Sequence, residues 1–198
     1  MPSEEPLKQQ KMRKLIMWNI ITLDGYFEGE QPWDLSFHEF IWGEELQKFS
    51  LEQLHSADYL VFGRRTYEGM AAHFQAAEGE IPRLMNQLPK LVFSRSLDSA
   101  DWYNTRLIRE QAAEEIRKLK SEGDGDMYVF GSAELSETFI KEELFDEYRI
   151  GISPAILGSG RALFGRGLPS RKLPLLSSQQ LSNGGMVLRY GKPSGPAE

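Results

Sequence analysis

The segment 58–70, with the sequence DYLVFGRRTYEGM, predicts the fold class. It begins with a short apolar run, stops at Gly63 and continues with helical character. The segment 127–144 repeats this order, because the apolar run MYVF is followed by Gly131 and then by SAELSETFIKEEL. Two strand–glycine–helix units in one chain predict an α/β fold.

The sequence on either side of these two units supplies the rest of the predicted fold. Apolar runs predict strands at 15–23, 58–62, 91–93, 105–108, 127–130 and 148–154. Helical patterns predict helices at 64–74, 81–88, 110–122 and 132–144, and one more over 37–54 that Gly43 can divide. The segments 172–181 and 186–190 flank Asn183-Gly184-Gly185 and predict an antiparallel hairpin. We expect a mostly parallel sheet with an antiparallel edge.

Length and composition limit the classes of protein to consider. The 198 residues suit one domain, expected over 13–191, with disordered tails at 1–12 and 192–198. A net charge of −6 argues against a nucleic-acid partner, and the longest apolar runs are too short for a membrane span. The polar N-terminal stretch lacks the apolar core of a signal peptide, so we expect a cytoplasmic protein.

Several kinds of catalytic site are excluded by the residues that the chain lacks. It has no cysteine, and its three histidines are far apart, so we expect no metal. Neither a GxSxG nor a GxxxxGK[ST] motif occurs. The run 158–163 starts like GxGxxG but has leucine at the third glycine, so it is either a surface loop or a loop that faces a ligand.

The two glycine turns are the strongest candidates for a binding site. Each places the N-terminus of a helix at the carboxyl edge of the sheet, where an anion can bind. Arg64, Arg65 and Arg95 follow strands that end at the same edge, and guanidinium groups suit a phosphate monoester. The alternatives are that the turns are purely structural and that the arginines form a solvated cluster.

Six segments together resemble the dihydrofolate-reductase-like fold, and more closely the RibD C-terminal family of riboflavin-biosynthesis reductases in its stand-alone form. They are TLDGYFEG at 22–29, DYLVFGRRTYEGM at 58–70, LVFSRSL at 91–97, MYVFGSAEL at 127–135, PAILGSGRALF at 154–164 and NGGMVLRY at 183–190. The resemblance implies a three-layer α/β/α fold and an NADPH-dependent reductase. The residues that it implies for the cofactor are Gly63, Arg64, Arg65, Thr66, Ser94, Arg95, Gly131, Ser132, Ala133, Glu134 and Leu135.

The resemblance says less about the substrate side. Asp24 of the LDG motif is a candidate proton carrier or, alternatively, part of a structural Asp-Gly turn. Dihydrofolate reductases carry an acidic residue five positions after the tryptophan of a Pro-Trp pair, whereas Pro32-Trp33 is followed at that spacing by His38. Asp34, His38 and Glu39 are the other catalytic candidates. The aromatic residues expected near the cleft are Trp18, Tyr26, Trp33, Phe37 and Trp42, of which Trp18 and Phe37 suit the core first.

The expected function is therefore hydride transfer from NADPH to a small heterocyclic or carbonyl substrate, in the manner of 5-amino-6-(5-phosphoribosylamino)uracil reductase of riboflavin biosynthesis. The alternatives are a non-catalytic nucleotide-binding module and an enzyme that binds phosphosugars without nicotinamide. Because relatives are often dimers, we expect a homodimer, with the apolar segment 152–157 as one possible contact surface.

Overall fold

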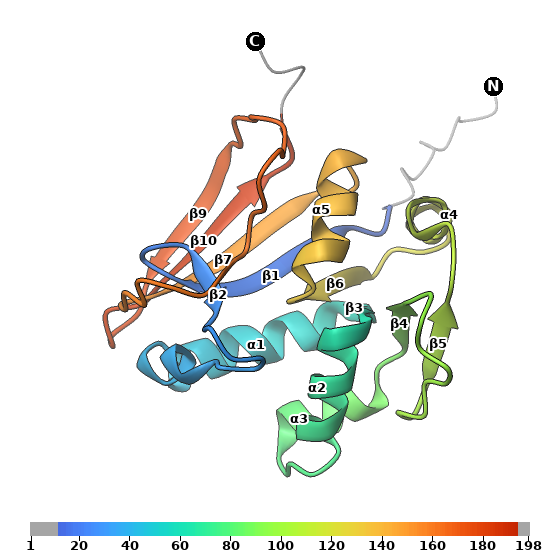
Figure 1. The fold of residues 1–198 in the computed structure, drawn as a ribbon, viewed down its shortest axis with the longest axis horizontal. Helices are drawn as coiled ribbons and strands as arrows, with labels where there is room; N and C mark the ends of the chain where they lie inside the picture. The colour runs from blue at the N-terminus through green and yellow to red at the C-terminus, as the bar shows by residue number, and fades with distance from the viewer. Residues whose placement is uncertain (1–11, 194–198) are drawn as a thin grey trace, which may run out of the picture.

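An eight-stranded sheet runs through the protein, whose computed structural model describes residues 12–193 (Figure 1). Its strands are β1 (Leu15–Thr22), β3 (Ala57–Gly63), β4 (Lys90–Phe93), β5 (Thr105–Ile108), β6 (Asp126–Phe130), β7 (Glu147–Ser153), β9 (Leu175–Gln180) and β10 (Met186–Gly191). They lie in the order β5-β4-β3-β6-β1-β7-β10-β9. The first six are parallel, and β10 is antiparallel to both of its neighbours. The mostly parallel sheet with a terminal hairpin is confirmed. The predicted tails fall mainly on residues 1–11 and 194–198, outside the described part.

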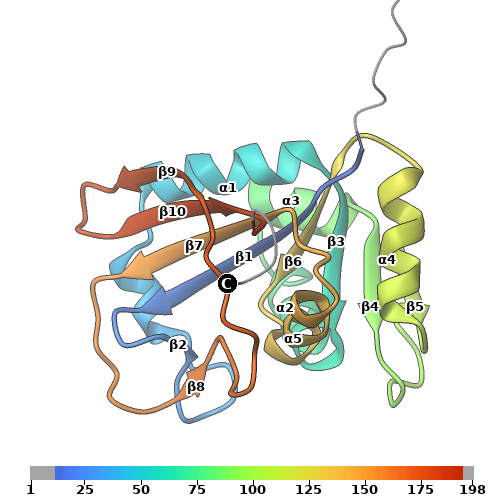
Figure 2. The same cartoon turned by 90° about the horizontal axis from the view of Figure 1, so that it is seen from above.

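Helices cover both faces of the sheet and make the three layers seen in Figure 2. They are the 3-10 helix η1 (Ser36–Phe40) and the α-helices α1 (Glu44–Ser56), α2 (Arg64–Phe74), α3 (Glu80–Gln87), α4 (Ala112–Ser121) and α5 (Ala133–Lys141). Leu15 and Met17 of β1 pack with α4 and α5, whereas Ile16 packs on the opposite face with α1, α2 and α3. Burial on both faces explains why the central strands are continuous apolar runs. Gly43 does divide the predicted helix, since η1 ends before it and α1 begins after it.

A small second sheet includes part of the run 158–163, which was expected to be a loop. In this segment β8 (Arg161–Ala162) pairs with β2 (Tyr26–Glu28). The close approach depends on Gly160, where a Cβ atom would lie 2.5 Å from the carbonyl oxygen of Glu28. A two-residue strand is too short to give an alternating pattern, so the sequence could not reveal it.

The structure corrects one part of the predicted dimer surface, whereas Ile156 in the same segment is exposed and the homodimer stays a prediction. Ile152 belongs to β7, which lies between β1 and β10, so the start of the 152–157 segment is an interior strand and not an open edge of the sheet. The strands with a free edge are β5 and β9. Among residues 12–193, no helix has the length and apolar character to cross a membrane. In the same range, no three His, Asp or Glu side chains are grouped as a metal site would require.

Candidate active site

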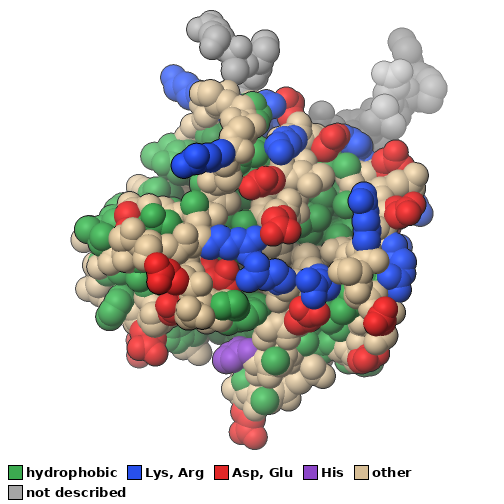
Figure 3. Space-filling model, in the orientation of Figure 1, with side chains coloured by type: hydrophobic (Ala, Val, Ile, Leu, Met, Phe, Trp, Pro, Cys, Tyr) green, Lys and Arg blue, Asp and Glu red, His purple; other side chains and the backbone are tan. Residues whose placement is uncertain are grey.

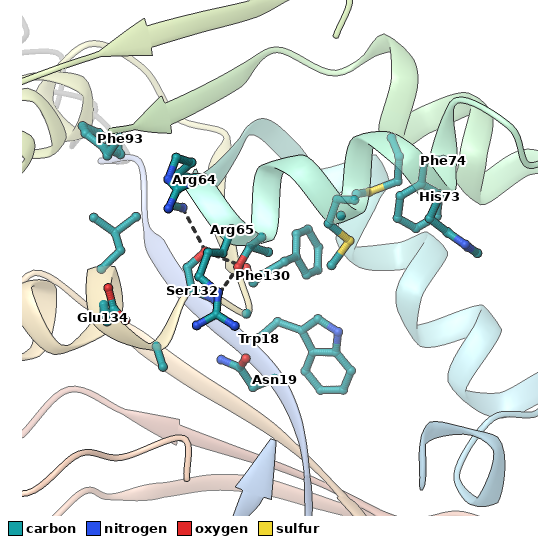
Figure 4. A pocket seen from close by; sticks show the side chains of 18 of the residues that line it. Trp18, Asn19, Arg64, Arg65, His73, Phe74, Phe93, Phe130, Ser132 and Glu134 are labelled. Atoms are coloured by element: carbon teal, nitrogen blue, oxygen red, sulfur yellow. Dashed lines mark hydrogen bonds between the residues drawn. The ribbon is translucent and has the colours of Figure 1, made fainter. Parts of the chain in front are cut away.

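A long cleft of about 1930 Å³ opens at the carboxyl ends of β3, β4, β5 and β6 and reaches the middle of β1. This edge of a parallel sheet is where ligands commonly bind in α/β proteins. Figure 4 looks into the cleft, with Arg64, Arg65 and Ser132 toward one end and His73 and Phe74 toward the other. The end that contains Arg64, Arg65 and Ser132 is called the cationic limb, and the end that contains His73 and Phe74 is called the aromatic limb.

The cationic limb is built on the two strand–glycine–helix turns, which are hydrogen-bonded to each other. The backbone N–H of Gly63 donates to Ser132 Oγ at 2.9 Å, and the backbone N–H of Ser132 donates to Thr66 Oγ1 at 3.0 Å. Gly131 and Ser132 both have φ of 58°, the left-handed conformation that turns β6 sharply into α5. The two turns are thus one unit, although their residues lie far apart in the chain.

Both helices of this unit begin without a side-chain cap. Neither Gly63 before α2 nor Ser132 before α5 makes a side-chain hydrogen bond that caps its own helix. The first N–H groups of a helix have no partner within the helix, and the helix dipole is positive there. The limb therefore offers two helix N-termini to an anion.

Arginine side chains add positive charge to the same limb. Arg64, Arg65 and Arg95 all line the cleft, so the structure brings together the three arginines that were expected at this edge. In Figure 3, Lys and Arg side chains gather over the N-terminal ends of α2 and α5. Arg95 forms no ion pair with any residue in the range 12–193. It lies within a turn in which Ser94 Oγ accepts hydrogen bonds from the N–H groups of Ser96 and Leu97. A phosphate group would give Arg95 the partner that it lacks.

The aromatic limb lies among β1, η1, α1, α3 and the body of α2. Its wall includes Trp18, Trp33, Trp42 and Phe74, with the polar side chains Asn19 and His38. Trp33 packs on α2 at Gly69, where an added Cβ atom would lie 1.8 Å from Trp33 Cζ2. Phe37 lies in the core instead, and Tyr26 lines a separate small pocket by β8. The predicted aromatic cluster is therefore divided between the cleft, the core and that pocket.

Two polar atoms on this limb are buried without a partner in the protein. Asn19 is 4% exposed, and its Nδ2 atom has no hydrogen bond, nor does Nε2 of His38. Burial lowers the pKa of His38 to about 4, so its imidazole is neutral at pH 7. Buried donors and acceptors are almost always satisfied in proteins. Both atoms are enclosed by the protein, so a molecule in the cleft does not reach them in this arrangement of the surrounding side chains.

The other three catalytic candidates are not among the residues that line the cleft. Asp24 accepts hydrogen bonds from Thr22 Oγ1 and from the N–H of Gly158, and the bond from Thr22 lowers the pKa of its carboxyl group. Asp24 thereby holds the 157–158 backbone, as an Asp-Gly turn residue would. Asp34 Oδ1 accepts a hydrogen bond from Ser36 Oγ at the start of η1, and Glu39 is an exposed residue of η1.

One carboxylate that sequence reasoning did not single out occupies the junction of the two limbs. Glu28 accepts a hydrogen bond from the backbone N–H of Trp33 at 2.8 Å and lies 3.9 Å from Arg65 and 3.6 Å from Arg161. Arg161 also donates to Glu134 at 2.7 Å. The sequence around Glu28 contains no pattern that identifies it as a residue of the cleft. Asn19, in contrast, could have been noticed as the single polar residue within the apolar run 15–21.

Comparison with known proteins agrees with this architecture. The sequence profile of the RibD C-terminal domain matches residues 13–187. The chain belongs to the RibD C-terminal domain family. This chain is 28% identical over 193 residues to the uncharacterized protein YyaP of Bacillus subtilis strain 168. The match covers 91% of this chain and 95% of YyaP.

Two solved structures show that the RibD C-terminal fold is shared. A Shewanella sp. PV-4 protein assigned to riboflavin biosynthesis superposes with a TM-score of 0.77 at 20% identity, covering 91% of this chain and 99% of the other. Dihydrofolate reductase from Enterococcus faecalis, solved with NADP(H), superposes with a TM-score of 0.60 at 15% identity, covering 92% of this chain and 98% of the other. The dihydrofolate-reductase-like fold is thereby confirmed.

Proposed function

We propose that this protein is an NADPH-dependent reductase whose cationic limb holds the cofactor. The observation that carries the proposal is the pair of uncapped helix N-termini, locked together by Ser132 and Thr66 and flanked by Arg64, Arg65 and Arg95. The turn residues Gly63–Thr66 and Gly131–Leu135 would hold the pyrophosphate. Ser94 and Arg95 would hold the 2′-phosphate that distinguishes NADPH from NADH.

Bound NADPH would supply a hydride, and the protein would supply orientation. The two helix N-termini fix the dinucleotide at one end of the cleft, and the substrate binds on the aromatic limb. Trp33 covers the body of α2 and helps to exclude water from this limb. The homodimer and the cytoplasmic location stay predictions from the sequence.

The cofactor assignment can be tested by fluorescence titration with NADPH and NADH. Replacing Arg95 with alanine removes a charge-assisted hydrogen bond of about 1.5–3 kcal/mol, so NADPH affinity should fall about 10- to 100-fold while NADH affinity stays the same. Arg83→Ala, on α3 and outside the cleft, is the matched control. Absence of NADPH binding, or binding indifferent to both the 2′-phosphate and Arg95, would refute the proposal.

A non-catalytic nucleotide-binding module is the second candidate. It is favoured because none of the predicted catalytic candidates is a proton donor in the cleft. Asp24, Asp34 and Glu39 do not line the cleft, and His38 is neutral at pH 7. A module of this kind would bind NADPH tightly, yet no pyrimidine, pteridine or quinone would oxidise the bound cofactor. Absorbance at 340 nm during incubation with a panel of such compounds separates the two functions.

A further inference from the structure

We infer that Arg109 is a positioning residue, which holds the turn that carries Arg95 and thereby makes the cleft select NADPH over NADH. This role rests on the proposed function, because it takes the 2′-phosphate of NADPH to be the group that Arg95 binds. Arg109 acts through Arg95 and does not itself contact the phosphate. Three features support the role: the exposure of the turn, the hydrogen bonds at its two ends and the partners of the Arg109 guanidinium.

The turn that carries Arg95 is ordered mainly by hydrogen bonds. It spans residues 94–98 after the carboxyl end of β4, and Arg95, Ser96 and Asp98 in it are exposed. Leu97 packs on the core, but only in part. An arginine on an unordered turn would lose conformational entropy each time that it bound a phosphate, so a fixed turn favours binding.

The start of the turn is fixed by the sheet and by the Ser94 side chain. The backbone N–H of Ser94 donates to the carbonyl oxygen of Ile108 at 3.0 Å, which continues the ladder between β4 and β5. Ser94 Oγ accepts hydrogen bonds from the N–H groups of Ser96 at 3.2 Å and of Leu97 at 3.0 Å. These bonds fix the backbone on both sides of Arg95.

The end of the turn is held by Arg109, which directly follows β5. Its Nη1 donates to the carbonyl oxygen of Leu97 at 2.9 Å, and its Nη2 donates to the carbonyl oxygen of Asp98 at 3.1 Å. A planar guanidinium can bind two neighbouring carbonyl groups in a fixed geometry, whereas a lysine ammonium is a point charge on a flexible stem. Arg109 therefore closes the turn from the neighbouring strand, with Arg95 between the two fixed ends.

The two arginines at this corner of the cleft have different partners. Both line the cleft, but the guanidinium of Arg109 is occupied by backbone carbonyl groups. Within residues 12–193, Arg95 has no carboxylate partner and is free to bind an anion. Arg106 of β5 lies three residues before Arg109, pairs with Glu115 and is not among the residues that line the cleft. Arg106 is therefore a matched arginine with no expected effect on the turn.

The first test compares the affinities for NADPH and NADH, measured by fluorescence titration of the full chain. In Arg109→Ala, NADPH affinity should fall about five- to tenfold, because binding must then order the turn, while NADH affinity stays the same. Arg109→Lys keeps the charge and should recover part of the loss. Arg106→Ala is the control and should preserve the ratio of the two affinities. An unchanged ratio in Arg109→Ala would overturn the inference.

A double-mutant cycle separates positioning from direct contact with the phosphate. If Arg109 acts only through Arg95, Arg109→Ala should change NADPH affinity less than about twofold in a protein that already carries Arg95→Ala. If the guanidinium of Arg109 bound the phosphate itself, its loss would weaken NADPH in that background as much as in the wild type. This second result would refute the positioning role.

Hydrogen exchange of the free protein tests the clamp without a cofactor. Peptides that contain Ser96 and Leu97 should exchange faster in Arg109→Ala than in the wild type, and peptides from β4 should not. Faster exchange in a protein that binds neither dinucleotide would refute the proposed cofactor and the selection of its phosphate, and would leave only the clamp. NADPH binding with unchanged exchange and an unchanged affinity ratio would refute the role of Arg109 alone.

Discussion

Removal of the Ser132 hydroxyl should loosen the whole cationic limb. In Ser132→Ala the N–H of Gly63 loses its acceptor at 2.9 Å and the carbonyl of Phe130 loses a donor at 3.2 Å. Ser132 is buried, and an unsatisfied buried polar group costs about 1–3 kcal/mol. Because 1 kcal/mol shifts the melting temperature of a chain this size by about 2–4 °C, the variant should melt roughly 2–12 °C lower. NADPH affinity should fall with it, since only the hydrogen bond from the backbone N–H of residue 132 to Thr66 Oγ1 still joins the two helix N-termini.

The assay is thermal and urea unfolding followed by circular dichroism, together with NADPH titration of the folded variant. Ser136→Ala provides a control in the same helix, because Ser136 is also buried but its hydroxyl reaches the carbonyl of Gly131 only at 3.5 Å. The control should lose less than about 1 kcal/mol. If Ser132→Ala unfolds at the wild-type urea concentration and binds NADPH as tightly, the hydroxyl does not join the two turns.

Three further outcomes are expected. Gly69→Ala raises the helix propensity of α2 by about 1 kcal/mol, but the added methyl group collides with Trp33 and displaces its ring from the helix. Acrylamide should therefore quench tryptophan emission more strongly in the variant. Unchanged quenching would contradict the packing of Trp33 on Gly69. Because the pKa of His38 falls from 6.5 to about 4 on folding, unfolding free energy should drop by about 3 kcal/mol as pH falls through that window, and His38→Gln should remove this slope. Burial alone would raise the pKa of Glu147, but hydrogen bonds from two arginines outweigh it and lower the pKa. The ionised carboxylate therefore stabilises the fold at neutral pH, and this contribution is lost as the pH falls below about 4.5. In thermal melts, the melting temperature of Glu147→Gln should depend less on pH in this acid range.

Much of the sheet could be predicted from the sequence, because buried parallel strands are continuous apolar runs that end at glycine. Leu60, Val61 and Phe62 carry this signal in β3, and the repeat at 127–130 carries it in β6. The order of the strands was not predictable from these runs. It depends on which apolar faces fit together, and β3 pairs with β6 across two intervening strands of the sequence.

The cationic limb could be predicted for the same reason, since its parts follow directly from strand ends. The aromatic limb was harder. Glu28 matters through its contacts with Trp33, Arg65 and Arg161, and these come together only in the folded chain. Asp24 shows the converse, because an acidic residue in a promising motif is used to hold the backbone of Gly158.

The position of β1 at the centre of the sheet has a consequence for how the chain is made. Its two neighbours are β6 and β7, which begin at Asp126 and Glu147, so β1 pairs with strands that are synthesised more than a hundred residues after it. Until then the apolar run LIMWNIIT has no partner in the sheet, which makes the nascent chain prone to aggregation. The cleft exists only once β3 and β6 have paired and Ser132 has joined their ends. A ligand that binds only this folded cleft would therefore shift the equilibrium toward the folded state and lower the amount of chain that can aggregate.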